Sequence, residues 1–295
     1  MRVLRLATRR SALAQWQASH VAALLERPTR LVLTTPRGDR DKTTPLNVID
    51  EHGLFVKEVQ AAVLDGTADI AVHAAKDLPS TPRLQPAGLT LAAVPRRGNP
   101  SDVLVGKALS ALAEGATVAT GSPRRRVQLQ HLRPDLSFVD LRGNLPTRLR
   151  RVPRNGSIIT ALAALERLGL EHRIADVLNQ EAFIPQVGQG ALAVECRSND
   201  EEALGALARI QHGPSRLAID AERAWLAFLG EGCDSPVAAN ATVDGRVITL
   251  TAMLASGDGS TLLTKRSIGT NPVEVGTRLA REMVATDPSL SAEPS

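Results

Sequence analysis

The stretch "IAVHAAKDLPSTP", residues 70–82, sets the pattern of a buried strand directly against two opposite charges. A mainly apolar run such as 70–74 is typical of a strand that is covered on both faces of a sheet. Lys76 and Asp77 follow at once, and two prolines then end the regular structure. In open α/β sheets, ligands bind beyond the carboxyl ends of the strands. The stretch therefore predicts both a fold class and a place for chemistry.

Short strand-like runs alternate with amphipathic helical stretches on both sides of this segment, as far as residue 212. The alternation predicts an α/β fold with mixed, mostly parallel sheets. The pattern changes after a further helix, because "ANATVDGRVITLTAML" at 239–254 contains Asp244-Gly245, which suits the tight turn of a hairpin. This last region predicts a small α+β domain with a three-stranded antiparallel sheet.

A chain of 295 residues exceeds the usual size of a single core, so more than one domain is expected. Two segments, 94–102 and 183–191, are candidate boundaries between apolar runs, and the first is rich in Pro, Gly and charge, as hinges are. We expect domain 1 at 1–93 with a return segment at 191–211, domain 2 at 98–187, and domain 3 at 214–295.

Composition argues against several classes of function. No segment has the apolar length of a secretory signal or a membrane span, which predicts a soluble, cytoplasmic protein without a membrane partner. A monomer is a separate expectation. Cys196 and Cys233 lie far apart and no CxxC pair occurs, so neither a disulfide scaffold nor a metal site is expected. The net charge of +4 raises the question of nucleic acid. Four Phe, two Trp and no Tyr offer few stacking platforms, so we expect no nucleic-acid partner.

Arginines stand at three strand-to-helix junctions, where cations are electrostatically unfavourable. The helix dipole penalises a cation at a helix start by about 0.3–1 kcal/mol unless an anion binds beside it. Several such junctions predict a ligand with many negative groups, although exposed arginines on solvated loops are the alternative for any one of them. The phosphate loop GxxxxGK[ST] and the GxGxxG fingerprint are both absent. The junctions are Arg9-Arg10 before the expected N-cap Ser11, Arg124-Arg125-Arg126 after Ser122 and Pro123, and Arg142 and Arg148 around Asn144.

A family resemblance fits this anion prediction. From the N-terminus to at least residue 240 the sequence closely resembles the porphobilinogen deaminases, also called hydroxymethylbilane synthases. The order and spacing of the matching motifs make the likeness specific. They are "LATRRSALAQWQA", "TPRGD", "GLFVKEVQAAVLDGTADIAVHAAKDLP", "SPRRRVQLQHLRPDL", "LRGNLPTRL", "ALERLGL", "VGQGALAVECR" and "AERAWLAFLGEGCDSPV".

The resemblance implies a reaction, a cofactor and an architecture. The family's enzymes join four porphobilinogen molecules head to tail, with loss of ammonia, to give the linear tetrapyrrole hydroxymethylbilane in heme biosynthesis. The chain grows on a dipyrromethane cofactor held by a cysteine thioether, and each pyrrole carries an acetate and a propionate. The first two domains resemble type II periplasmic binding proteins around a cleft, and the third domain presents the cysteine.

The resemblance also implies roles for individual residues. Asp77 matches the catalytic aspartate, which stabilises the positive charge that develops as ammonia leaves. Cys233 matches the cofactor-attachment cysteine, whereas Cys196 receives no role. The implied cofactor contacts are Lys76, Thr120, Ser122, Arg124, Arg125 and Arg148, and the implied substrate contacts are Arg9, Ser11, Gln17, Arg142, Phe55 and Lys57.

Several positions depart from the family pattern. Ala74 stands where a Ser is usual, Gly121 and Pro123 replace a Ser and a Leu, and the cysteine loop reads "GEGCDSP". The hydrogen bond that a Ser hydroxyl at position 74 would make is worth about 0.5–1.5 kcal/mol, so its loss should weaken cofactor binding without abolishing it. These changes leave open a slow or inactive paralogue that binds pyrroles or other anions. A nucleic-acid binder that uses the arginine clusters is a further, less favoured alternative.

Overall fold

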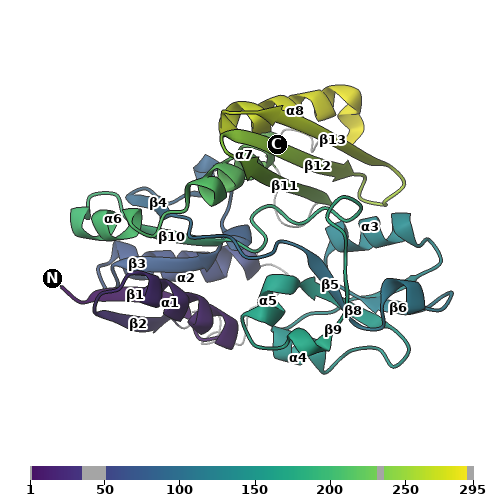
Figure 1. Ribbon diagram of the computed structural model, residues 1–295, viewed down its shortest axis with the longest axis horizontal. Coiled ribbons are helices and arrows are strands. Elements are labelled where there is room, and N and C mark those ends of the chain that lie inside the picture. Colours follow the sequence, from purple (N-terminus) through teal and green to yellow (C-terminus); the bar gives the residue numbers. More distant parts are fainter. Residues whose placement is uncertain (1, 35–50, 231–235, 291–295) are drawn as a thin grey trace. The chain divides into compact units, whose positions relative to one another are not determined.

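The computed structural model describes residues 2–34, 51–230 and 236–290, without the side chains of 51–55 and Pro82. The chain divides into two compact units (Figure 1). Unit 1 comprises Met1–Arg97 and Ala191–Arg216, and unit 2 comprises Gly98–Gly190 and Leu217–Ser295. The boundaries at 97/98 and 190/191 lie inside the two candidate boundary segments of the sequence. The division into three domains stays a prediction, since 98–190 and 217–295 form one unit here.

Unit 1 is built on a five-stranded sheet with the order β2-β1-β3-β10-β4. β1 pairs in parallel with β2 and β3, whereas β10 is antiparallel to both β3 and β4. Four of the five strands therefore share one direction, and only the return strand opposes them. The strands are β1 (Leu4–Arg9), β2 (Thr29–Thr34), β3 (Ile70–Ala74), β4 (Leu89–Ala93) and β10 (Leu192–Arg197).

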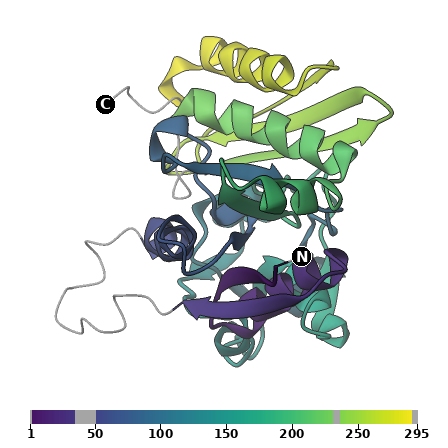
Figure 2. The same ribbon diagram turned by 90° about the vertical axis from the view of Figure 1, so that its left-hand side faces the viewer.

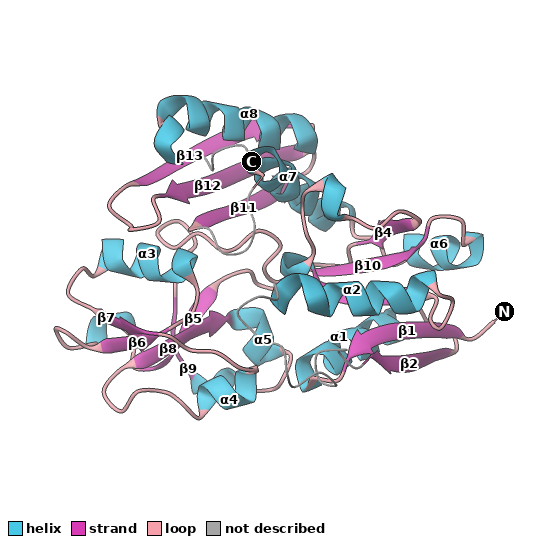
Figure 3. Cartoon of the chain, turned by 180° about the vertical axis from the view of Figure 1, so that it is seen from behind, coloured by secondary structure: helices cyan, strands magenta, loops and turns pink. Residues whose placement is uncertain are grey.

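Helices cover both faces of this sheet. Successive side chains of a strand point to opposite faces, so Ile70 and Val72 join the core beneath α1 and α6. Ala71 faces the other way and contacts the core under α2, which runs along the sheet in Figure 3. The helices of unit 1 are α1 (Ala12–Leu24), α2 (Glu51–Leu64) and α6 (Glu201–Ala208).

Unit 2 contains a second five-stranded sheet with an equivalent topology, β7-β6-β8-β5-β9. β6 is parallel to β7 and β8, and β5 is antiparallel to β8 and β9. The single strand that opposes the others is β5, the first strand of this sheet in sequence. In the sheet of unit 1 it is β10, the last strand in sequence. The elements are β5 (Asp102–Gly106), β6 (Thr117–Ala119), α3 (Pro123–Leu132), β7 (Ser137–Val139), α4 (Leu145–Leu149), β8 (Ser157–Ala161), α5 (Leu162–Glu166) and β9 (Ile174–Val177).

The two connecting segments touch each other within unit 2. The amide of Gly98 donates to the carbonyl of Gly190 over 3.0 Å. Gly190 has a φ of 81°, and a Cβ at this position would lie 2.6 Å from the carbonyl oxygen of Gly98. Both the backbone conformation and the close approach therefore require glycine at position 190.

The rest of unit 2 is an antiparallel three-stranded sheet with the order β11-β12-β13. Gly245, with a φ of 57°, opens the two-residue hairpin loop, the position where a type II′ turn favours glycine. Trp225 lies at 0% exposure in the core that α7 and α8 form with this sheet. Figure 2 shows the yellow helix α8 alongside the strands of this sheet. The elements are α7 (Gly213–Leu229), β11 (Val237–Asp244), β12 (Val247–Ala255), β13 (Leu262–Gly269) and α8 (Pro272–Thr286).

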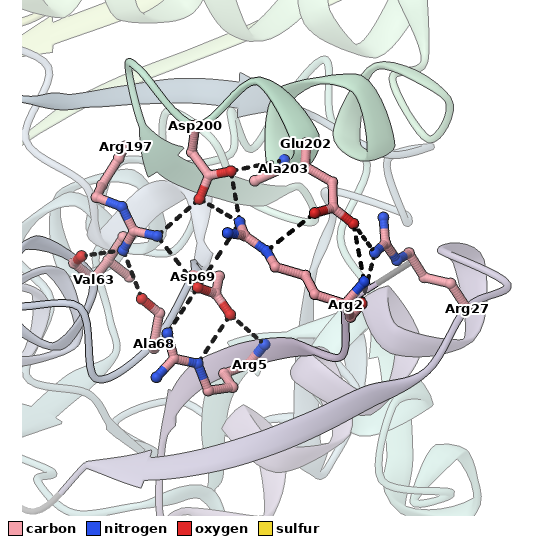
Figure 4. Close-up of polar contacts among 10 residues, drawn as sticks. All are labelled: Arg2, Arg5, Arg27, Val63, Ala68, Asp69, Arg197, Asp200, Glu202 and Ala203. Atoms are coloured by element: carbon pink, nitrogen blue, oxygen red, sulfur yellow. Dashed lines mark hydrogen bonds and ion pairs between the residues drawn. The ribbon is translucent and has the colours of Figure 1, made fainter.

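Where β1 and β3 begin, unit 1 carries an ionic cluster that we call the far-edge network (Figure 4). At its centre Asp69, 2% exposed, accepts hydrogen bonds from the side chains of Arg5 and Arg197 at 2.9–3.2 Å. Asp200 caps α6 and also accepts from Arg197. The cluster therefore fastens the return segment to the N-terminal segment. Its members are Arg2, Arg5, Arg27, Asp69, Arg197, Asp200 and Glu202.

Candidate active site

In unit 1, four of the expected site residues follow parallel strands at one edge of the sheet. β1 ends at Arg9, two residues before Ser11, and β3 leads into a single 3₁₀ turn, Ala75–Asp77, that carries Lys76. The turn is held in place because the amide of Ala75 donates to the carbonyl of Ala191 over 3.0 Å. Because the two strands are parallel neighbours, their ends share an edge.

The side chains at this edge differ in exposure. Arg9, Lys76 and Asp77 are half-buried, so they reach solvent while their positions are set by the sheet. The Ser11 hydroxyl accepts a hydrogen bond from the amide of Ala14 over 3.3 Å, which confirms it as the N-cap of α1. Gln17 is buried on the same helix.

Three other expected residues are placed less fully. Lys57 is exposed on α2, and Phe55 belongs to the same helix, although its side chain is outside the described part. Cys233 lies in 231–235, outside the described residues. Cys196 is fully buried on β10, and burial raises the pKa of its thiol to about 11. Such a thiol stays protonated and poorly nucleophilic, in agreement with the absence of a role for it.

In unit 2, the remaining expected residues follow β6 and β7 at the corresponding edge. Ser122 is confirmed as the N-cap of α3, since its hydroxyl accepts from the amide of Arg125 over 3.4 Å, with Pro123 at the first helical position. Thr120 accepts from the amide of Ser122 over 3.2 Å and so shapes this turn. Asn144 is likewise confirmed as the N-cap of α4.

Arg124 and Arg125 are buried and share one carboxylate, a contact that no local sequence signal indicates. Asp102, the first residue of β5, has 0% exposure. Its Oδ2 accepts from Arg124 over 2.8 Å, and its Oδ1 accepts from Nε and Nη2 of Arg125 over 2.9 and 2.7 Å. Burial alone would raise the pKa of Asp102, but the two guanidinium groups hold it below its usual range. Two cations therefore share one anion inside the protein.

Arg148 and Arg142 have no carboxylate partner within the described part of the chain. Nε of Arg148 donates to the carbonyl of Gly143 over 2.7 Å. Burial lowers the pKa of Arg148, and the positive charge of Arg125 lowers it further. Arg142 is exposed. In contrast, Arg126 pairs with Asp140 over 3.0 Å at the surface.

Arg167, which follows α5 and lies in the motif "ALERLGL", received no role from the sequence. Its Nη2 donates to the carbonyl of Gly190 over 2.6 Å, and burial lowers its pKa. Arg124 and Arg125 thus carry more positive charge than Asp102, the carboxylate that they share, neutralises. The residues present fit a ligand that is rich in carboxylates. No group of three His, Cys, Asp or Glu among the described residues could hold a metal ion.

Comparison with known proteins agrees with this chemistry. Residues 4–205 match the family model described as "Porphobilinogen deaminase, dipyromethane cofactor binding domain", and residues 216–285 match "Porphobilinogen deaminase, C-terminal domain". The porphobilinogen deaminase of Roseiflexus sp. (strain RS-1) is 46% identical over 257 residues, covering 85% of this chain and 84% of the relative. That of Syntrophomonas wolfei is 43% identical over 298 residues, covering 96% of each.

Structural similarity to solved structures is weaker. The Bordetella pertussis BvgS VFT2 domain aligns with a TM-score of 0.42 and 16% identity over 70% of this chain and 86% of that chain. An arginine-specific periplasmic binding protein from Salmonella typhimurium gives 0.38 and 14% over 70% and 91%. The two family models and the identities of 43–46% show that the chain belongs to the porphobilinogen deaminase family.

Proposed function

We propose that the chain is a hydroxymethylbilane synthase, a transferase that condenses four porphobilinogen molecules head to tail with loss of ammonia. The observation that carries the proposal is the family match over both 4–205 and 216–285. The arginine-rich strand edge of unit 2 supports it, because each pyrrole of the substrate and product bears two carboxylates. None of the comparisons favours an inactive paralogue.

Asp77 is the proposed catalytic residue. As the amine of the substrate leaves as ammonia, positive charge develops on the pyrrole that remains, and a nearby carboxylate lowers the free energy of that state. The 3₁₀ turn fixes the backbone of Asp77, so little reorganisation is needed when the charge appears. Lys76 beside it would bind a ligand carboxylate. The other proposed substrate contacts are Arg9, Ser11, Gln17, Phe55, Lys57 and Arg142.

Dipyrromethane, joined as a thioether to Cys233, is the proposed cofactor, and it supplies the pyrrole onto which the first substrate is condensed. Its carboxylates would be held by Lys76, Thr120, Ser122, Arg124, Arg125 and Arg148. The buried positive charge of Arg124 and Arg125, only half neutralised by Asp102, fits such a group. Covalent attachment at Cys233 is part of the proposal.

Intact mass provides the first test of the function. The full chain, expressed in a host that makes porphobilinogen, should carry a mass increment equal to two pyrrole units and give the colour reaction of a dipyrromethane. Cys233→Ser should lose the increment, and Cys196→Ser should keep it, because that thiol is buried and protonated. A wild-type mass equal to that of the bare chain would contradict the proposal.

Turnover provides the second test. Asp77→Asn removes the negative charge with little change in shape, so kcat should fall by about 100-fold or more. Asp69→Asn, in the far-edge network, should leave kcat within about twofold of the wild type. Near-normal turnover of Asp77→Asn would remove Asp77 from its proposed role.

The cytoplasmic location and the monomeric state stay predictions. Within residues 2–34, 51–230 and 236–290, no helix is long and apolar enough to cross a bilayer.

A further inference from the structure

The buried triad of Asp102, Arg124 and Arg125 holds an unbalanced charge in a dry environment. The side chains of Arg124 and Arg125 are only 4% and 8% exposed, and that of Asp102 is 0% exposed. Two guanidinium groups against one carboxylate leave one positive charge without a counter-ion among the contacts within the triad. A buried charge without a counter-ion is energetically unfavourable, because water no longer solvates it. This arrangement is therefore one that an incoming anion would complete.

The hydrogen bonds of Arg124 show how this charge is held. Nη1 donates to the carbonyl of Ile184 over 2.8 Å, and Nη2 donates to Asp102. Nε is buried and has no hydrogen-bond partner in the described part of the chain. The guanidinium carbon lies 5.7 Å from the ring centroid of Phe183. Burial and the charge of Arg125 both lower the pKa of Arg124, and only Asp102 opposes them.

Asp102 also joins this charge to both connecting segments. It enters β5 from the first segment, and it accepts a side-chain hydrogen bond from Gln189 of the second. Gln189 in turn donates to the carbonyl of Pro100 over 2.7 Å. The opposing direction of β5 brings its first residue to the same sheet edge as the ends of β6 and β8. The carboxylate therefore has a fixed position beside the start of α3.

We propose that Asp102 is a positioning residue for cofactor binding, which fixes the guanidinium groups of Arg124 and Arg125 and leaves the triad with one positive charge in excess. The inference rests on the proposed function, because the cofactor's carboxylates are the anion in question. Each oxygen of Asp102 serves one arginine, so both cations are oriented before the ligand arrives. Pre-orientation of this kind reduces the ordering that binding must bring about.

Asp102→Asn tests the role, because an amide keeps the shape but accepts through one oxygen only. Its NH₂ group would face the donors of the second arginine, which is then released from its position. We expect the fraction of purified full-length chain that carries the dipyrromethane increment to fall at least fivefold. For the molecules that do load, KM should rise by more than kcat falls. Asp102→Glu, which keeps the charge but moves it by one methylene, should load better than Asp102→Asn.

Asp69→Asn is the matched control. Asp69 is also a buried aspartate at the start of a strand that two arginines share, but it lies in the far-edge network (Figure 4). The Asp69→Asn variant should have a lower free energy of unfolding than the wild type, yet it should load the cofactor to the same extent. Equal falls in loading for both variants would overturn the inference in favour of a general stability effect.

Two further results would also overturn the inference. If Asp102→Asn loaded as well as or better than the wild type, Asp102 would be a bystander or a competitor for the arginines. If Asp102→Asn did not fold, a folded Asp102→Glu that loaded the cofactor as well as the wild type would also overturn the inference. Failure of the proposed function is distinguishable, since the wild type itself would then show no increment.

Discussion

Asp69 in unit 1 and Asp102 in unit 2 are two versions of one arrangement. Each is a buried aspartate beside the first residues of a strand, and each accepts side-chain hydrogen bonds from two arginines. They differ in what surrounds the surplus cation. Arg2 and Glu202 of the far-edge network are 42% and 40% exposed, so water solvates the excess charge there. Around Asp102 both arginines are buried.

The difference shows that the surroundings, and not the number of ion pairs, decide whether such a cluster suits a ligand. An excess positive charge that is exposed to solvent is screened by water and salt, so it needs no counter-ion, as is the case for the charges of most surface ion pairs. An excess positive charge that is buried away from water is screened less, so it attracts an anion more strongly. The far-edge network therefore serves the fold of unit 1, and the Asp102 triad also prepares unit 2 for an acidic ligand.

The largest expected effect comes from removing each carboxylate. Asp102→Ala leaves two buried cations without an anion, so the free energy of unfolding should fall by about 3–5 kcal/mol. Asp69→Ala exposes its arginines to water, and the loss should be nearer about 1–3 kcal/mol. Urea denaturation of both full-length variants measures the difference. Equal losses would remove the distinction between the dry and the wet cluster.

Acid should weaken the far-edge network in a defined window. Burial alone would raise the pKa of Asp69, but hydrogen bonds from Arg5 and Arg197 outweigh it and lower the pKa to about 2. Since the folded pKa lies below the unfolded value, the stabilisation is complete above about pH 4 and is lost as the pH falls to about 2. The gap in unfolding free energy between wild type and Asp69→Asn should be about 2 kcal/mol at pH 7 and close over that window. A gap that stayed constant with pH would contradict this assignment.

The smallest effect is expected at the exposed rim of the network. Glu202 pairs with Arg27 and Arg2, but its side chain is 40% exposed. Glu202→Gln should therefore shift the midpoint of thermal unfolding by no more than about 2 °C. Repeating the scan in 1 M NaCl should remove even this shift, because the Debye length is then about 3 Å. A larger, salt-resistant shift would mean that the rim behaves like the buried centre.

Local features of the fold could be predicted from the sequence because their causes are local. Ser11, Ser122 and Asn144 cap the helices as expected, since capping depends on the residues that follow within one turn. The apolar stretch 70–74 forms a strand, and the charged pair after it forms the turn at the sheet edge. The roles of those side chains cannot be predicted from any local pattern, and they came from the family resemblance alone.

The partner of the buried arginines could not be predicted in this way. Asp102 is 22 residues from Arg124 and lies on the one strand that opposes its neighbours, so only the sheet order brings them together. The arginines at the start of α3 predicted an external anion from the helix dipole alone. Of the two negative charges needed to neutralise Arg124 and Arg125, the chain itself supplies one, Asp102. The same reason hides the role of Arg197, which reaches Asp69 across 128 residues.

The place of β10 in the sheet of unit 1 has a consequence for synthesis on the ribosome. β10 lies between β3 and β4, yet it begins 99 residues after β4 ends, from Ala93 to Leu192. At about 5–20 residues per second the growing chain keeps this gap open for roughly 5–20 s. The second sheet, made of the contiguous segment 102–177, can close during that interval. The sheet whose first strands emerge earliest is therefore completed only after the second five-stranded sheet has emerged, and until then its unpaired strand edges are what a nascent-chain chaperone would have to shield.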